Sequence, residues 1–101
     1  MPERLVIRAI GPSLTAAGVP DALADPVLTI FDRDGNPIVS NDNWQDTQRQ
    51  ELIDTTLAPN HPNEAAIAIT LNPTNYTAVV SGLNDTTGGG LVEVYNITLE
   101  D

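Results

Sequence analysis

The chain has 101 residues, and its fourteen Asp and Glu residues against four Arg and no Lys give a formal net charge of −10, which disfavours nucleic acid and anionic lipid surfaces as partners. The absence of cysteine excludes disulfides, thiolate metal sites and thiol chemistry. There is neither a signal peptide nor an apolar run near the ~20 residues that span a bilayer, so we expect no membrane insertion and either a cytosolic protein or a mature or excised segment.

Short apolar runs rich in Val, Ile, Thr and Tyr alternate with stretches of Gly, Pro, Asn and Asp, which predicts an all-β fold. Their spacing is typical of an antiparallel β-sandwich of jelly-roll or immunoglobulin-like size, formed as a single module over residues 1–101. The predicted strands are Arg4 to Ile10, Val27 to Asp32, Pro37 to Asn41, Ala65 to Leu71, Tyr76 to Gly82 and Leu91 to Thr98.

Two short helical segments are predicted between these strands. One is a turn over Ser13 to Gly18, and the other is a helix over Thr47 to Asp54 that is capped by Asn43 or Asp46. In this helix, Leu52 and Ile53 are expected to point inward. The bulky face of the fourth strand, with Ile67, Ile69 and Leu71, is expected to form the core, together with Leu5, Ile7, Leu28, Ile30 and either Val79 or Val80.

Oxygen-bearing side chains gather between Phe31 and Asp46, which suggests calcium, because this ion prefers six to eight oxygen ligands. The predicted ligands are Asp32, Asp34, Asn36, Asn41, Asp42 and Asp46. The segment is not an EF-hand, since Gly35 stands at the fourth position and Asn43 at the twelfth. A plain hairpin turn, with Gly35 at positive φ and Asp side chains bonded to the turn backbone, is the alternative.

Trp44 is the only tryptophan, and two roles are open to it. It packs over the core, which is the favoured role for a lone large aromatic, or it forms with Asn43 an exposed platform for a sugar or peptide. No catalytic centre is predicted: Ser13 lacks the nucleophile-elbow glycines, and His61 has no recognisable nucleophile partner. Asn-x-Thr sequons make Asn75, Asn84 and Asn96 glycosylation candidates.

Five blocks of the sequence together resemble a repeat module found in large secreted and cell-surface proteins of environmental bacteria. The blocks, whose order matches over nearly the whole chain, are Ile7-Arg-Ala-Ile-Gly-Pro-Ser-Leu14, Leu23-Ala-Asp-Pro26, Phe31 to Asp46, Tyr76-Thr-Ala-Val-Val-Ser-Gly82 and Leu91-Val-Glu-Val-Tyr95. Leu28 to Asn43 and the later Asn75-Tyr-Thr also resemble, more weakly, the bacterial pre-peptidase C-terminal domain.

The resemblance implies an extracellular, non-catalytic β-sandwich, often present in tandem copies, that serves adhesion, spacing or assembly. Such tandem modules usually carry a further Gly-rich β segment before the strand that here begins at Arg4. This sequence does not include that segment, which favours strand donation between subunits.

Two functions are therefore expected to compete. The first is a structural or adhesive building block that self-associates as a homo-oligomer, filament or tandem array, stiffened by calcium. The alternative is an appendage module of a secreted enzyme that binds polysaccharide or an extracellular protein through Trp44 and Asn43.

Overall fold

The computed structural model describes residues 2–98 of the chain. Its elements are β1 (Glu3–Ile10), α1 (Pro12–Ala16), β2 (Pro26–Phe31), β3 (Pro37–Asn41), the 3₁₀ turn η1 (Trp44–Asp46), α2 (Arg49–Asp54), β4 (Ala65–Leu71), β5 (Thr77–Gly82), the 3₁₀ turn η2 (Leu83–Asp85) and β6 (Leu91–Asn96). The predicted all-β class is confirmed. The bounds of β3 and β4 are as predicted, while the ends of the other strands differ by one or two residues.

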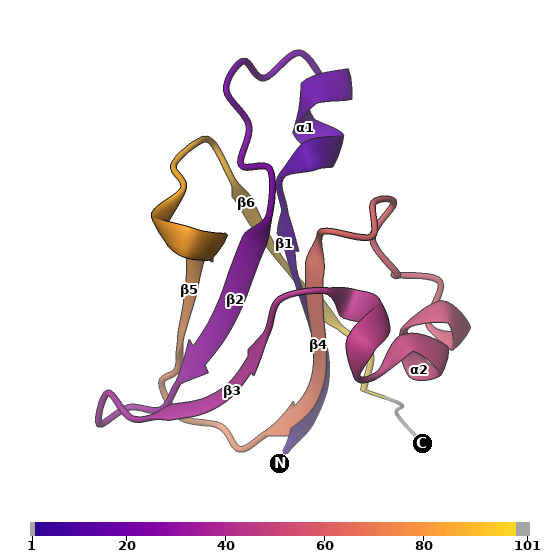
Figure 1. The fold of residues 1–101 in the computed structure, drawn as a ribbon. Coiled ribbons are helices and arrows are strands. Elements are labelled where there is room, and N and C mark those ends of the chain that lie inside the picture. The colour runs from indigo at the N-terminus through magenta and orange to yellow at the C-terminus, as the bar shows by residue number, and fades with distance from the viewer. Residues whose placement is uncertain (1, 99–101) are drawn as a thin grey trace.

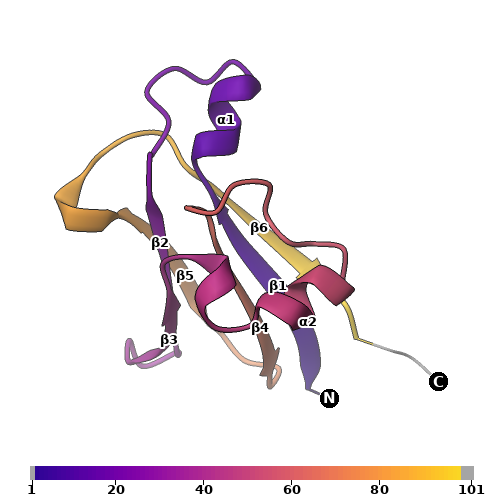
Figure 2. The ribbon, with the colours of Figure 1, turned by 45° about the vertical axis from the view of Figure 1, so that its right-hand side comes forward.

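The strands form two antiparallel sheets that face each other (Figures 1 and 2). One sheet, called the β1 sheet, has the order β4-β1-β6, and the other, called the β2 sheet, has the order β3-β2-β5. Contacts between the sheets place β3 over β4, β2 over β1 and β4, and β5 over β6. One side of the sandwich is therefore edged by β3 and β4, and the opposite side by β5 and β6.

The main core lies between the two sheets. Ile7 and Ala9 of β1, Leu28 and Ile30 of β2, and Ile67 of β4 are buried there because alternate residues of a strand point to the same face. The predicted core residues Leu5, Ile69 and Val80 pack at its margin. Of the two valines left open, Val80 faces this core, whereas Val79 points to the outer face of the β2 sheet and is 41% exposed.

A second apolar cluster covers the outer face of the β1 sheet. Trp44 of η1 and Leu52 of α2 pack there against Val6, Ala66 and Ala68. The small side chains on this face of β4 leave room for the indole and for the helix. Ile53 does not point inward as predicted: it is 39% exposed, since the six-residue helix has only one buried side.

Candidate functional site

The predicted calcium ligands lie at the two ends of the β2–β3 hairpin. At its tip, Asp32 Oδ1 accepts the backbone N–H groups of Asp34 and Asn36, each at 2.9 Å, and Gly35 has a φ of 85°. These hydrogen bonds hold the pKa of Asp32 below its usual value, with the Asn36 N–H the largest cause. The tip therefore has the geometry of the turn alternative, in which the carboxylate is occupied by the backbone.

Asn41 lies at the other end of β3 and is buried with its amide fully engaged. Its Oδ1 accepts the N–H of Ala66 at 3.1 Å, while its Nδ2 donates to the Asn43 carbonyl and to Thr47 Oγ1. The five residues of β3 separate the hairpin tip from Asn41 by about 15 Å, because a strand rises about 3.3 Å per residue. The six residues predicted as one set of ligands therefore do not converge on a single point.

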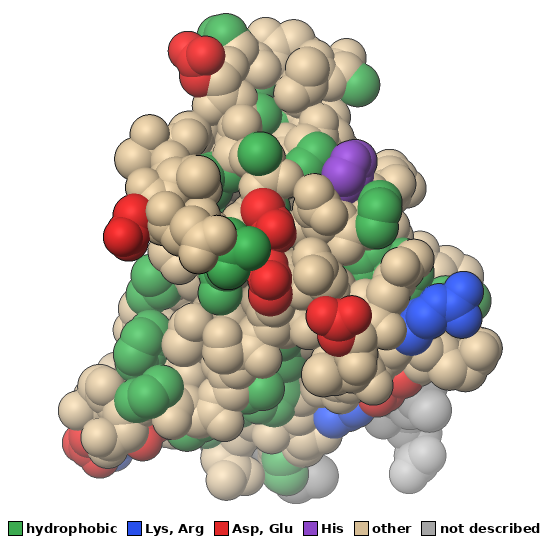
Figure 3. All heavy atoms as spheres, in the orientation of Figure 1, with side chains coloured by type: hydrophobic (Ala, Val, Ile, Leu, Met, Phe, Trp, Pro, Cys, Tyr) green, Lys and Arg blue, Asp and Glu red, His purple; other side chains and the backbone are tan. Residues whose placement is uncertain are grey.

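Asp25 and Asp42 form a different acidic pair where β3 ends and β2 begins. Asp25 Oδ1, Asp42 Oδ1 and Asn43 Oδ1 are buried atoms with no hydrogen-bond partner within residues 2–98. Acidic side chains are visible over this part of the molecule in Figure 3. Asp25, which the sequence analysis missed, precedes β2 directly and is brought to Asp42 because β2 and β3 are paired antiparallel neighbours.

The electrostatics of this cluster are unfavourable to a second negative charge. Burial, the contact with Asp25 and the negative charges of Asp25 and Asp46 together raise the pKa of Asp42 to about 6, and burial is the largest cause. Asp46, which was predicted as a metal ligand, contributes negative charge to this pair, and its own side chain is exposed. A divalent cation bound here would favour the ionised carboxylates, because its charge would offset their repulsion and carboxylate oxygens are its preferred ligands. Residues 2–98 contain no cluster of three or more His, Cys, Asp or Glu side chains arranged to hold a metal ion.

Trp44 is buried, as the favoured role predicted. It is 6% exposed, and its Nε1–H donates to the His61 carbonyl at 3.2 Å. The alternative of an exposed platform made by Trp44 and Asn43 is wrong, because neither face of the indole is free to stack on a sugar.

Ser13 and His61 have structural contacts. Ser13 Oγ donates to Glu64 Oε1 at 2.8 Å, and Glu64 Oε2 accepts the N–H groups of Gly11 and Ser13, each at 3.0 Å. Glu64 is fully buried, and its carboxylate accepts the hydrogen bonds of the free N–H groups at the start of α1. His61 Nδ1 accepts the N–H of Asn63. No local pattern indicates the role of Glu64, since its partners lie more than 50 residues away along the chain.

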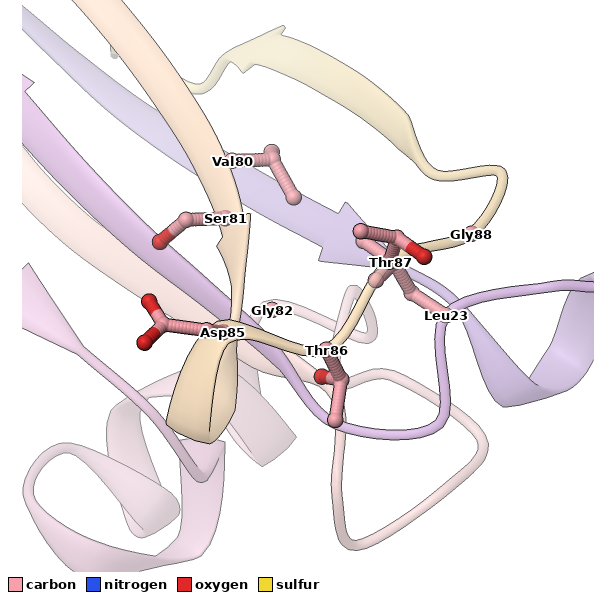
Figure 4. Close-up of a pocket in the computed structure, with 8 residues that line it drawn as sticks. All are labelled: Leu23, Val80, Ser81, Gly82, Asp85, Thr86, Thr87 and Gly88. Carbon is pink, nitrogen blue, oxygen red and sulfur yellow. The ribbon is translucent and has the colours of Figure 1, made fainter.

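A polar pocket of about 370 Å³ lies where β5 passes into η2 and the following loop (Figure 4). Figure 4 shows the side chains of Ser81 and Asp85 pointing away from those of Val80 and Thr87. Asp85 is the only ionisable residue in its lining. The polar groups of this pocket thus do not converge in the manner of a nucleophile and its base.

The β3 and β4 edges of the sandwich are blocked. Gln48 caps β4 with its side-chain amide: Nε2 donates to the Ala68 carbonyl and Oε1 accepts the Ala68 N–H, both at 2.9 Å. Asn41 does the same for the Ala66 N–H. On the other sheet, β3 begins with Pro37 and has an irregular register with β2. Side-chain caps, proline and bulges are features that prevent a further strand from adding.

The opposite side, edged by β5 and β6, has none of these devices. Neither strand contains Pro, Lys or Arg, and Glu93, the one acidic residue of the two, is paired with Arg8. Arg8 also donates to Tyr95 Oη and to the Leu57 carbonyl, so these contacts hold the outer face of β6 in place. Figure 2 shows β6 beside β1 at the margin of its sheet.

Apolar side chains are exposed along this open side. Val94 is 58% exposed and Val92 38%, although their register with Ile7 and Ala9 places them on the face that points into the sandwich. An apolar cavity of about 270 Å³ lies between the sheets here, lined by Leu5, Ile7, Ile30, Ala78 and Val94 among others. The sheets therefore do not close over their core along β5 and β6.

The three sequon asparagines are all exposed. Asn84 has a φ of 56° within η2, and Asn96 at the end of β6 donates through Nδ2 to Glu3. No helix among the described residues is long and apolar enough to cross a membrane.

Comparison of this chain with known proteins identifies no relative. No family model, no curated protein and no solved structure matches this chain. The fold places the chain in the class of antiparallel β-sandwiches, with one blocked and one open side.

Proposed function

We propose that this chain is a non-catalytic structural module that associates with copies of itself, within an extracellular or cell-surface assembly. The observation that carries the proposal is the asymmetry of its edges. Side-chain amides and a proline block β4 and β3, whereas β5 and β6 expose backbone groups and apolar side chains. Long exposed strand edges are templates for pairing with another chain, so an edge without protection is suited to assembly.

The extracellular location and the tandem arrangement rest on the sequence resemblance. That module class consists of non-catalytic sandwiches in secreted and surface proteins, and the all-β fold of this chain agrees with it. The non-catalytic role is supported by the site geometry, because Ser13 and His61 are engaged in structural hydrogen bonds and Asp85 is the one ionisable residue that lines the polar pocket.

Calcium is part of the proposal, but its ligands differ from those first expected. Asp25 and Asp42 would hold the ion through their unpartnered buried oxygens, with Asp46 adding negative charge nearby. The bound ion would neutralise the carboxylates and tie the start of β2 to the end of β3. Because a ligand that binds only the folded state stabilises it, the module would be more stable in calcium.

The test is the mass in solution, measured by size-exclusion chromatography with light scattering over a range of protein concentrations, in calcium and then in chelator. Self-association predicts particles heavier than the 10.8 kDa chain, with a mass that rises with concentration. A monomer throughout would contradict the proposed function. Thermal unfolding in the same buffers tests calcium: an unchanged Tm would contradict the metal role and leave the assembly proposal standing.

A further inference from the structure

We propose that two copies join through β6, whose free edge pairs antiparallel with β6 of the second copy about a two-fold axis at Val94. The inference rests on the proposed self-association and names the surface that performs it.

The free edge of β6 offers a regular row of backbone groups. Ile97 N–H donates to the Arg4 carbonyl at 2.8 Å, so residues 97, 95, 93 and 91 hydrogen-bond to β1. In an antiparallel ladder the alternate residues point the other way. Val92, Val94 and Asn96 therefore direct their N–H and C=O groups away from β1, toward a neighbouring strand.

Pairing about Val94 gives a self-complementary register. Val94 then lies opposite the partner's Val94, and Val92 lies opposite the partner's Asn96. On the other face, Glu93 lies opposite the partner's Tyr95. No like charges stand directly opposite each other, an arrangement that would be destabilising. Glu93 is moreover already neutralised by Arg8 in its own copy.

The same arrangement covers the exposed apolar residues. The inward-facing valines of the partner's β6 continue the row formed by Val92 and Val94, next to the open cavity between the sheets. Since β5 lies over β6, the two-fold axis also brings β5 to face β5 of the second copy. Both open edges are then used in one interface, and both sheets continue from one copy into the other.

Charge sets the conditions under which this dimer forms. Each copy carries a net charge of −10, so two copies repel one another at long range. Within β6 the only charged residue is Glu93, which is paired with Arg8, but the Glu3 carboxylate accepts a hydrogen bond from Asn96 at the same edge. The repulsion from this group and from the rest of the surface is screened by salt. Dimerisation should therefore become tighter, not weaker, as the ionic strength rises.

The experiment measures the dimer dissociation constant of the wild type, Val94→Arg and Ile38→Arg by sedimentation at several concentrations. Val94→Arg places two cations face to face on the axis, and we expect the dissociation constant to rise about tenfold or more. Ile38 is the matched control: it is an exposed β-branched residue of β3, on the opposite side of the sandwich, and its replacement should change the constant little. Circular dichroism checks that each variant folds.

A second measurement uses the absence of cysteine. Val94→Cys introduces a single thiol, and opposed residues of a hydrogen-bonded pair have Cα atoms about 5.5 Å apart, within disulfide reach. Mild oxidation should give a covalent dimer of Val94→Cys but not of Ile38→Cys. Oligomers that persist in Val94→Arg, with no crosslink through Cys at 94, would overturn the β6 interface and leave self-association intact. A monomeric wild type would overturn both.

Discussion

Replacing Glu64 tests whether one buried carboxylate holds the connection between β1, α1 and β4. Glu64 is fully buried and accepts three hydrogen bonds, from the N–H groups of Gly11 and Ser13 and from Ser13 Oγ. Glu64→Ala removes the acceptor and leaves these donors without a partner in the interior. Each unsatisfied buried group costs about 1–3 kcal/mol, so the loss of all three hydrogen bonds should lower the free energy of unfolding by roughly 3–9 kcal/mol.

Glu64→Gln gives a graded comparison. The amide oxygen can still accept both backbone N–H groups, and the amide nitrogen can donate to Ser13 Oγ once the hydroxyl rotates. Only the additional strength of the charged acceptor is lost, which is about 1–2 kcal/mol. Because domains of this size are stable by only about 5–15 kcal/mol, the alanine variant should be near the limit of folding.

The assay is urea unfolding followed by circular dichroism and tryptophan fluorescence at neutral pH. Glu51→Ala is the control, since Glu51 forms a partly exposed ion pair with Arg4 whose loss should cost no more than about 1 kcal/mol. The reasoning would be refuted if Glu64→Ala cost as little as Glu51→Ala, or if Glu64→Gln cost as much as Glu64→Ala.

Further predictions concern the acidic cluster, the blocked edge and the indole. The folded-state pKa of Asp42, about 6, lies above its ordinary value of 3.8. In chelator, the stability that this raised pKa contributes is therefore fully present below pH 3.8 and is lost as the pH rises through about 6. The lost stability is below about 3 kcal/mol, because the partly exposed side chain is screened by solvent. Unfolding of the wild type and of Asp42→Asn across this pH window measures the loss. A wild-type stability that does not change with pH would contradict the prediction. Asp25→Asn should abolish the rise in Tm on adding calcium, whereas Asp32→Asn should keep it; the opposite pattern would place the ion at the hairpin tip. Gln48→Ala should lower the free energy of unfolding by about 1–3 kcal/mol and promote aggregation, because it exposes the Ala68 backbone; unchanged unfolding and light scattering would disprove the cap. Trp44 should emit at short wavelength and resist quenching by acrylamide, and ready quenching would show an exposed indole.

The strands were predictable because each carries its own signal. The alternation in β4 identified Ile67 and Ile69 as residues facing the main core, and the Gly and Asn of the hairpin marked the turn between β2 and β3. The burial of Trp44 also followed from its size alone. These features depend on neighbours within a few residues, which a single sequence displays directly.

The polar contacts were harder to predict because they join distant parts of the chain. Asp25 meets Asp42 only after β2 and β3 pair, and Asn41 reaches Ala66 across the gap between the sheets. The oxygen-rich hairpin therefore suggested one calcium site, whereas pairing separated its tip from its base. The sequence also left open whether Val79 or Val80 faces the core, since both suit a strand.

The amide caps on β4 limit the number of partner strands that the β1 sheet can bind. A sheet with two free edges can add partners without end, but Gln48 and Asn41 leave the β1 sheet only one edge to offer. A two-fold contact through that edge consumes it, so a single module stops at a pair rather than growing into a fibre. Long assemblies then require several modules on one chain. Each module would contribute one such bond, and the strength of attachment would be set by the number of modules in register.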